Sequence, residues 1–149
     1  MTGSFEVEAL SLATREQVFA VLADVPRWHE WAGPAVPASS YAREGADAPG
    51  GLGAIRKLGM GPLSSLEEIV AYDPPEHLAY VLLTGQRWHR YQADVHLHAL
   101  ANGGTRIVWT GRFQVPRGLQ GPLTAAFRRL VGGFAHRLAA RAEATGPGP

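Results

Sequence analysis

The segment 122–144 constrains the fold of this chain more than any other. Its apolar residues recur at three- and four-residue spacing, which places them along one face of an α-helix. Pro122 suits the first turn of that helix, because its missing N–H would have no partner there. A helix of this length measures about 30 Å and needs a long apolar partner surface. The stripe comprises Leu123, Phe127, Leu130, Val131, Phe134 and Leu138.

The composition predicts a single globular domain. The chain has 149 residues, of which 46% are hydrophobic, and its net charge is +1 without any basic block, so neither nucleic acid nor an anionic membrane is an expected partner. Cysteine is absent, which excludes disulfides and thiolate chemistry. We expect residues 1–144 to form the domain and 145–149 a disordered Gly-Pro tail. No signal peptide or membrane span is predicted, and the expectation is a cytoplasmic bacterial protein.

The pattern before the terminal helix predicts strands and two short helices. A first strand at 5–11 is followed by a helix that Thr14 caps, with Gln17 in the capping-box position, and by a second short helix at 24–31. Consecutive strands joined by short turns make an antiparallel meander. We therefore predict an α+β fold in which a curved sheet of about seven strands surrounds the long C-terminal helix, leaving a cavity between them. The remaining strands are expected at 39–44, 52–58, 65–72, 78–83, 91–97 and 106–113.

Several local motifs follow one another in the same order as this pattern. They are DVPRWHEW at 24–31, GAIRK at 53–57, EEIVAYDPP at 67–75, LAY at 78–80, Tyr91, GTRIVW at 104–109 and the terminal helix. Together they resemble the START/Bet v 1-like (SRPBCC) superfamily, of the polyketide cyclase/dehydrase and lipid-transport type. The resemblance implies a helix-grip fold with an internal cavity for a hydrophobic small molecule. It does not fix the activity, because carriers, sensors and cyclases share this fold.

Four polar residues are expected on the inward face of the sheet, namely Arg56, Glu67, Tyr80 and Tyr91. If 61–62 form the tip of a tight hairpin, Arg56 lies directly opposite Glu67. A buried charge is costly unless it is paired. The four residues therefore form either a structural ion pair with supporting hydroxyls, or a site that orients a ligand head group or performs acid–base chemistry. The predicted ligand-binding residues are Arg56, Leu58, Glu67, Ile69, Tyr80, Leu82, Tyr91, Ala93, Val95, Trp109, Phe127, Leu130 and Phe134.

The histidines are the other candidates for chemistry. His89, near the expected cavity mouth, joins Glu67, Arg56 and Tyr91 as a candidate catalytic residue. Asp94, His96 and His98 share the outward face of one strand. No metal site is predicted there, because a single strand offers poor tetrahedral geometry. No cofactor is predicted either.

Three functions fit these observations. The first is binding of a hydrophobic polyketide-, lipid- or aromatic-like molecule between the sheet and the C-terminal helix. The second is an aromatase/cyclase-like enzyme in which Glu67 or a tyrosine acts as acid or base and Arg56 polarises a carbonyl. The third is a protein-interaction module with a vestigial cavity. A cyclase needs a pre-organised proton-transfer group, whereas a carrier needs only shape and area.

Overall fold

The computed structural model describes residues 2–46, 50–60, 64–84 and 90–145. The order of elements matches the prediction: one strand, two short helices, six strands and a long helix. The elements are β1 (Thr2–Ser11), α1 (Arg15–Ala23), the 3₁₀ helix η1 (Val25–Glu30), β2 (Ser39–Arg43), β3 (Ile55–Leu58), β4 (Ser65–Asp73), β5 (His77–Leu82), β6 (Gln92–Ala99), β7 (Thr105–Gln114) and α2 (Gln120–Thr145).

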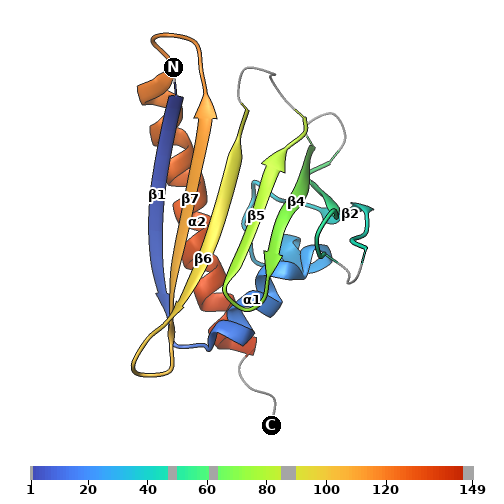
Figure 1. Ribbon diagram of the computed structural model, residues 1–149, viewed down its shortest axis with the longest axis vertical. Helices are drawn as coiled ribbons and strands as arrows, with labels where there is room; N and C mark the ends of the chain where they lie inside the picture. The colour runs from blue at the N-terminus through green and yellow to red at the C-terminus, as the bar shows by residue number, and fades with distance from the viewer. Residues whose placement is uncertain (1, 47–49, 61–63, 85–89, 146–149) are drawn as a thin grey trace.

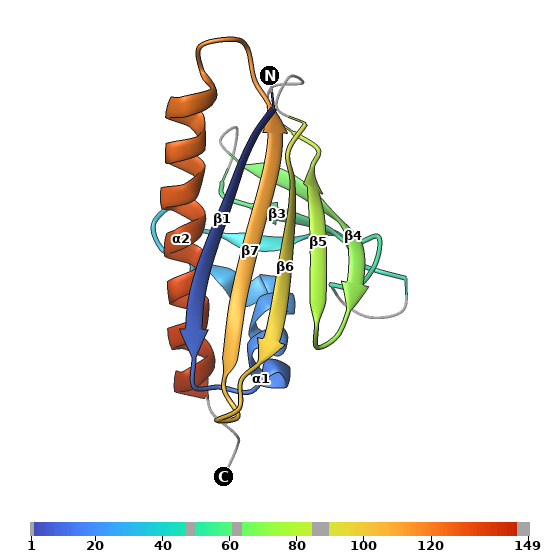
Figure 2. The ribbon, with the colours of Figure 1, turned by 60° about the vertical axis from the view of Figure 1, so that its left-hand side comes forward.

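Within the described residues, seven strands form one antiparallel sheet in the order β1-β7-β6-β5-β4-β3-β2. Six consecutive strands pair with their neighbours in sequence, and β1 closes the sheet by pairing with β7. The helix α2 runs along one face of this sheet beside β1 (Figures 1 and 2). The predicted α+β class and the curved seven-stranded sheet around a C-terminal helix are confirmed.

The two faces of the sheet follow the alternation in the sequence. On β6, Ala93, Val95 and Leu97 are buried toward α2, whereas His98 on the opposite face is exposed. The predicted cap of α1 is also present, since the Thr14 hydroxyl accepts a hydrogen bond from the Gln17 N–H and the side-chain Oε1 of Gln17 accepts one from the Thr14 N–H. Local signals thus set both the strand faces and the first helix boundary.

The helix α2 is buried unevenly along its length. Val131 near its middle and Phe134 and Leu138 in its second half are buried, while Phe127 is only partly buried and Leu130 is 40% exposed. The apolar stripe is therefore continuous in sequence but packs tightly only where the sheet and the short helices close on it. The first half of α2 has room beneath it.

Several predicted boundaries differ from the structure by one to three residues. The strand predicted at 52–58 begins only at Ile55, because Gly53 has φ +83°, a conformation outside the β region, and Leu52 is 57% exposed. The terminal helix begins two residues before Pro122 and includes Thr145, the first residue of the predicted tail. The rest of that tail, 146–149, lies outside the described residues. No helix among the described residues is long and apolar enough to cross a membrane.

Candidate functional site

A buried ion pair crosses the β3–β4 strand pair. Arg56 lies opposite Glu67 and Leu58 opposite Ser65, which is the predicted register. The Nε of Arg56 donates to Oε1 of Glu67 at 2.8 Å, and the two residues are 1% and 8% exposed. Each charge offsets part of the cost of removing the other from water.

Two aromatic rings complete the surroundings of the Arg56 guanidinium. Its central carbon lies 4.4 Å from the centre of the Trp28 ring and 4.0 Å from that of the Tyr80 ring. Aromatic faces attract a desolvated cation and so offset part of the cost of burying it. Among the described residues, Nη1 of Arg56 has no hydrogen-bond partner. The arginine is therefore held by one carboxylate and two π faces.

The two tyrosines of the site keep their protons. Tyr80 Oη accepts a hydrogen bond from Nε1 of Trp109 at 3.2 Å. Burial, reinforced by the negative charge of Glu67, raises the pKa of Tyr80 well above its usual value. Burial also raises the pKa of Tyr91, with further contributions from Tyr80 and Glu67. Both hydroxyls are therefore neutral groups at any pH near 7.

A cavity of about 190 Å³ lies between this polar cluster and the first half of α2. Glu67 is the one charged side chain among the described residues that line it, and Tyr80 and Tyr91 contribute hydroxyls. Most of the remaining wall is apolar. The lining residues are Ser65, Glu67, Tyr80, Leu82, Tyr91, Phe127, Leu130, Val131 and Phe134.

The cavity collects part of the predicted ligand-binding set. Glu67, Tyr80, Leu82, Tyr91, Phe127, Leu130 and Phe134 line it, whereas Arg56, Leu58, Ile69, Ala93, Val95 and Trp109 are buried outside its wall. Beside the cavity, an aromatic cluster fills the interior. In it the Trp28 ring centre lies 6.3 Å from that of Trp109 and 6.2 Å from that of Phe134. The cavity in the structure is therefore shorter than the predicted one, which was lined by residues along the whole inward face of the sheet.

Two lining residues were missing from the predicted site. Ser65 faces the cavity because it sits opposite Leu58 in the register, and Val131 because it belongs to the apolar stripe of α2. Both signals were available in the sequence. Trp28 lies in η1, and its contact with the Arg56 guanidinium is a feature of the tertiary structure. His89, a candidate catalytic residue, lies outside the described residues.

A curved antiparallel sheet gripping a long C-terminal helix, with a small cavity between the two, defines the helix-grip class of proteins. The chain belongs to the polyketide cyclase / dehydrase and lipid transport family, whose model matches residues 2–143. This confirms the family predicted from the motifs.

Two solved structures share the fold. A crystal structure of an uncharacterised protein from Bacillus thuringiensis has a TM-score of 0.73 at 11% identity, covering 95% of this chain and 99% of that one. The structure of the protein XoxI from Bacillus cereus has a TM-score of 0.71 at 12% identity, covering 95% of each chain. No curated protein sequence matches this chain. At these identities the likeness concerns the fold alone.

Proposed function

We propose that this protein binds a small, neutral, ring-sized molecule with a hydroxyl group in the cavity under the first half of α2. The observation that supports this most directly is an apolar cavity with one carboxylate, that of Glu67, in its wall. Ligand sites typically combine an apolar surface with a few fixed polar groups. The ion pair with Arg56 fixes this carboxylate before any ligand arrives.

The volume limits the size of the ligand. A dry cavity of about 150 Å³ holds a benzene molecule, whereas drug-sized ligands occupy about 300–1,000 Å³. The cavity here, at about 190 Å³, fits one substituted ring. A whole polyketide or an acyl chain would need Leu130 to move aside, and this residue is 40% exposed at the edge of the cavity. A single aromatic ring is therefore the ligand that the cavity suits without rearrangement.

The charges favour a neutral head group. Arg56 is already paired with Glu67 and lies outside the cavity wall, so the charge that a ligand meets is the carboxylate. A ligand carboxylate placed beside it would suffer like-charge repulsion in a partly desolvated site. A phenol or alcohol could instead donate its hydrogen to Glu67. Tyr80 and Tyr91 line the same cavity, so their hydroxyls are candidates to join this network.

The same electrostatics favour binding over tyrosine-based catalysis. An effective general base has a pKa near the working pH. The pKa values of Tyr80 and Tyr91 are instead raised by burial, so neither hydroxyl is ready to accept a proton as a phenolate. Neutral hydroxyls suit ligand recognition. This supports a carrier or sensor rather than a cyclase that uses a tyrosine base.

Three ring compounds of matched size test the proposal: p-cresol, p-toluate and toluene. Titration calorimetry should show p-cresol binding, with p-toluate weaker by about tenfold or more, equivalent to about 1.4 kcal/mol. Toluene should bind more weakly than p-cresol because it cannot donate to Glu67. Equal or tighter binding of p-toluate would refute the assigned role of Glu67.

Filling the cavity provides the matching variant. Leu130→Trp places a larger side chain on the cavity edge and should abolish p-cresol binding while the fold is retained. Leu119→Trp is the control, because Leu119 is 44% exposed and does not line the cavity. Unchanged binding in Leu130→Trp, or equal loss in both variants, would place the ligand elsewhere.

A further inference from the structure

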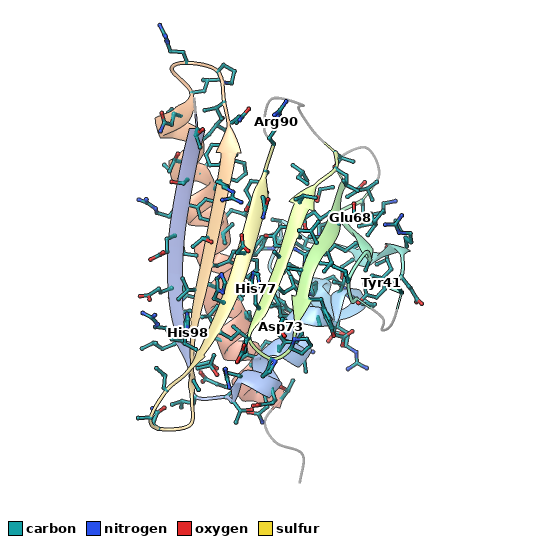
Figure 3. The ribbon with its side chains drawn as sticks, viewed as in Figure 1. Tyr41, Glu68, Asp73, His77, Arg90 and His98 are labelled. Atoms are coloured by element: carbon teal, nitrogen blue, oxygen red, sulfur yellow. The ribbon has the colours of Figure 1, made fainter. Side chains whose placement is uncertain are left out.

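Three side chains of types that commonly bind metal ions lie close together on the outer face of the sheet, opposite to α2. His77 on β5 and His96 on β6 are directly paired in the sheet register, and their rings stack with centres 4.3 Å apart. His77 Nε2 lies 2.7 Å from Oδ1 of Asp94, two residues before His96 on β6. Figure 3 looks onto this face, with His77 on β5 and His98 near the end of β6.

We propose that His77, Asp94 and His96, which we call the outer-face triad, bind a divalent transition-metal ion. One ligand atom from each of the three residues lies within 4.8 Å of the others. Around a tetrahedral zinc ion with bonds of about 2.0–2.1 Å, ligand atoms are about 3.3 Å apart. His77 Nε2 and Asp94 Oδ1 are 2.7 Å apart, so they need to separate by only about 0.6 Å to reach this spacing. A metal ion would then replace the hydrogen that the two atoms share.

The fold removes the reason for expecting no metal here. Asp94, His96 and His98 on one strand would offer a metal poor geometry, but β5 supplies His77 from a second direction. Directly opposed residues on antiparallel strands have Cβ atoms about 4.5–5.5 Å apart, which lets two imidazoles reach one ion. The parallel rings must turn about their side-chain torsions so that their nitrogen lone pairs converge. This is feasible because the His77 side chain is 26% exposed and His96 is only partly buried.

The donor set selects the metal. Two imidazoles and one carboxylate suit Zn²⁺, Co²⁺, Ni²⁺ and Cu²⁺, whereas Mg²⁺ and Ca²⁺ prefer oxygen ligands alone. Three protein ligands leave positions for water or for one further side chain. His98 is near, with its ring centre 6.4 Å from that of His96.

Titration of untagged protein with Ni²⁺ and Zn²⁺ at neutral pH tests the triad. Calorimetry should detect one ion per chain, and Co²⁺ should give a visible absorption band of a bound complex. Metal affinity should fall by about tenfold or more in each of the variants His77→Gln, Asp94→Asn and His96→Gln. Even the loss of a residue that only hydrogen-bonds to a metal ligand lowers metal affinity by about 10–100-fold. Mg²⁺ should not bind at the same concentration.

His136→Gln is the matched control, since it removes one exposed histidine from α2, far from the triad in sequence and on another element. It should leave the affinity unchanged. Circular dichroism of each variant checks that the fold persists. Absence of a stoichiometric site in the unmodified protein, or equal affinity in the triad variants and the control, would overturn the proposal.

Discussion

The guanidinium of Arg56 meets the carboxylate of Glu67 at 2.8 Å directly across the β3–β4 strand pair, with both side chains buried. The rings of Trp28 and Tyr80 also contact the guanidinium, and its Nη1 has no hydrogen-bond partner among the described residues. Each partner therefore offsets part of the cost of burying the charge of the other. The coupling free energy between the two side chains can therefore be measured with a double-mutant cycle.

Glu67→Gln and Arg56→Met should each lower the free energy of unfolding by about 3–5 kcal/mol, because each leaves one buried charge without its partner. The double variant should cost less than the sum of the two, as a urea-denaturation double-mutant cycle will show. The exposed pair Glu8–Arg106, also at 2.8 Å, is the control and should couple by less than about 1 kcal/mol. Equal coupling in both cycles would mean that burial does not matter for this pair.

Phe134→Ala should enlarge the cavity. Removing a phenylalanine from a closed core costs about 3–5 kcal/mol, and Phe134 should cost less because one side of it already borders open space. The enlarged cavity should bind 2-naphthol more tightly than the unmodified protein does. Phe113→Ala is the comparison, since Phe113 is 1% exposed and does not line the cavity. A loss of stability as large as that of Phe113→Ala, without a change in 2-naphthol binding, would contradict this view of the wall.

Stability should fall as the pH rises above about 10, where an unperturbed tyrosine ionises. Above that pH the unfolded chain releases the proton of Tyr80 while the folded protein retains it, because burial raises the folded-state pKa. Each such group contributes a slope of about −1.4 kcal/mol per pH unit between its unfolded and folded pKa. Tyr80→Phe should remove one such slope and leave those of Tyr91 and Tyr41, whose pKa values burial also raises. Denaturant titrations at pH 9–12 give the slope of the unfolding free energy against pH for each protein. Identical slopes for Tyr80→Phe and the unmodified protein would show that Tyr80 ionises normally.

Two glycine substitutions should act in opposite directions. A Cβ on Gly111 would approach Phe5 Cζ to 2.3 Å, because Phe5 covers this glycine from the paired strand β1. Gly111→Ala should therefore cost about 1–3 kcal/mol through overpacking. A Cβ on Gly132 in α2 would meet only Val7 Cγ1, at an ordinary 3.8 Å. Gly132→Ala should stabilise the protein by up to about 1 kcal/mol, because alanine favours the helix. Thermal melts of the two variants decide both signs, and a destabilised Gly132→Ala would reveal a contact absent from this structure.

Much of the architecture could be predicted from the amino-acid sequence. Period-two alternation identified the inward side chains of β6, and the three- and four-residue spacing identified α2. The pairing of Arg56 with Glu67 also followed from sequence, because a short connection allows only a narrow choice of register between β3 and β4. These features depend on interactions between residues close in the chain.

The extent of the cavity depended on packing. Alternation placed Trp109 and Phe134 on the same interior side, but it could not tell which part of that interior aromatic rings would fill. Trp28 comes from η1, far from both in sequence, and it occupies the space beside them and beside Arg56. The cavity lies under the first half of α2, and Trp28 is not among the described residues that line it.

The outer-face triad shows the same division most clearly. The sequence placed Asp94 and His96 on one face of β6 because alternate residues of a strand share a face. The chain between β5 and β6 is longer than a tight turn, so local chemistry did not specify which residue of β5 would lie opposite His96. That choice is made by the hydrophobic pairing of Leu78 with Val95 on the buried face, and it brings His77 beside His96 on the other. Only the tertiary structure, through burial on one face of the sheet, decided which side chains meet on the other.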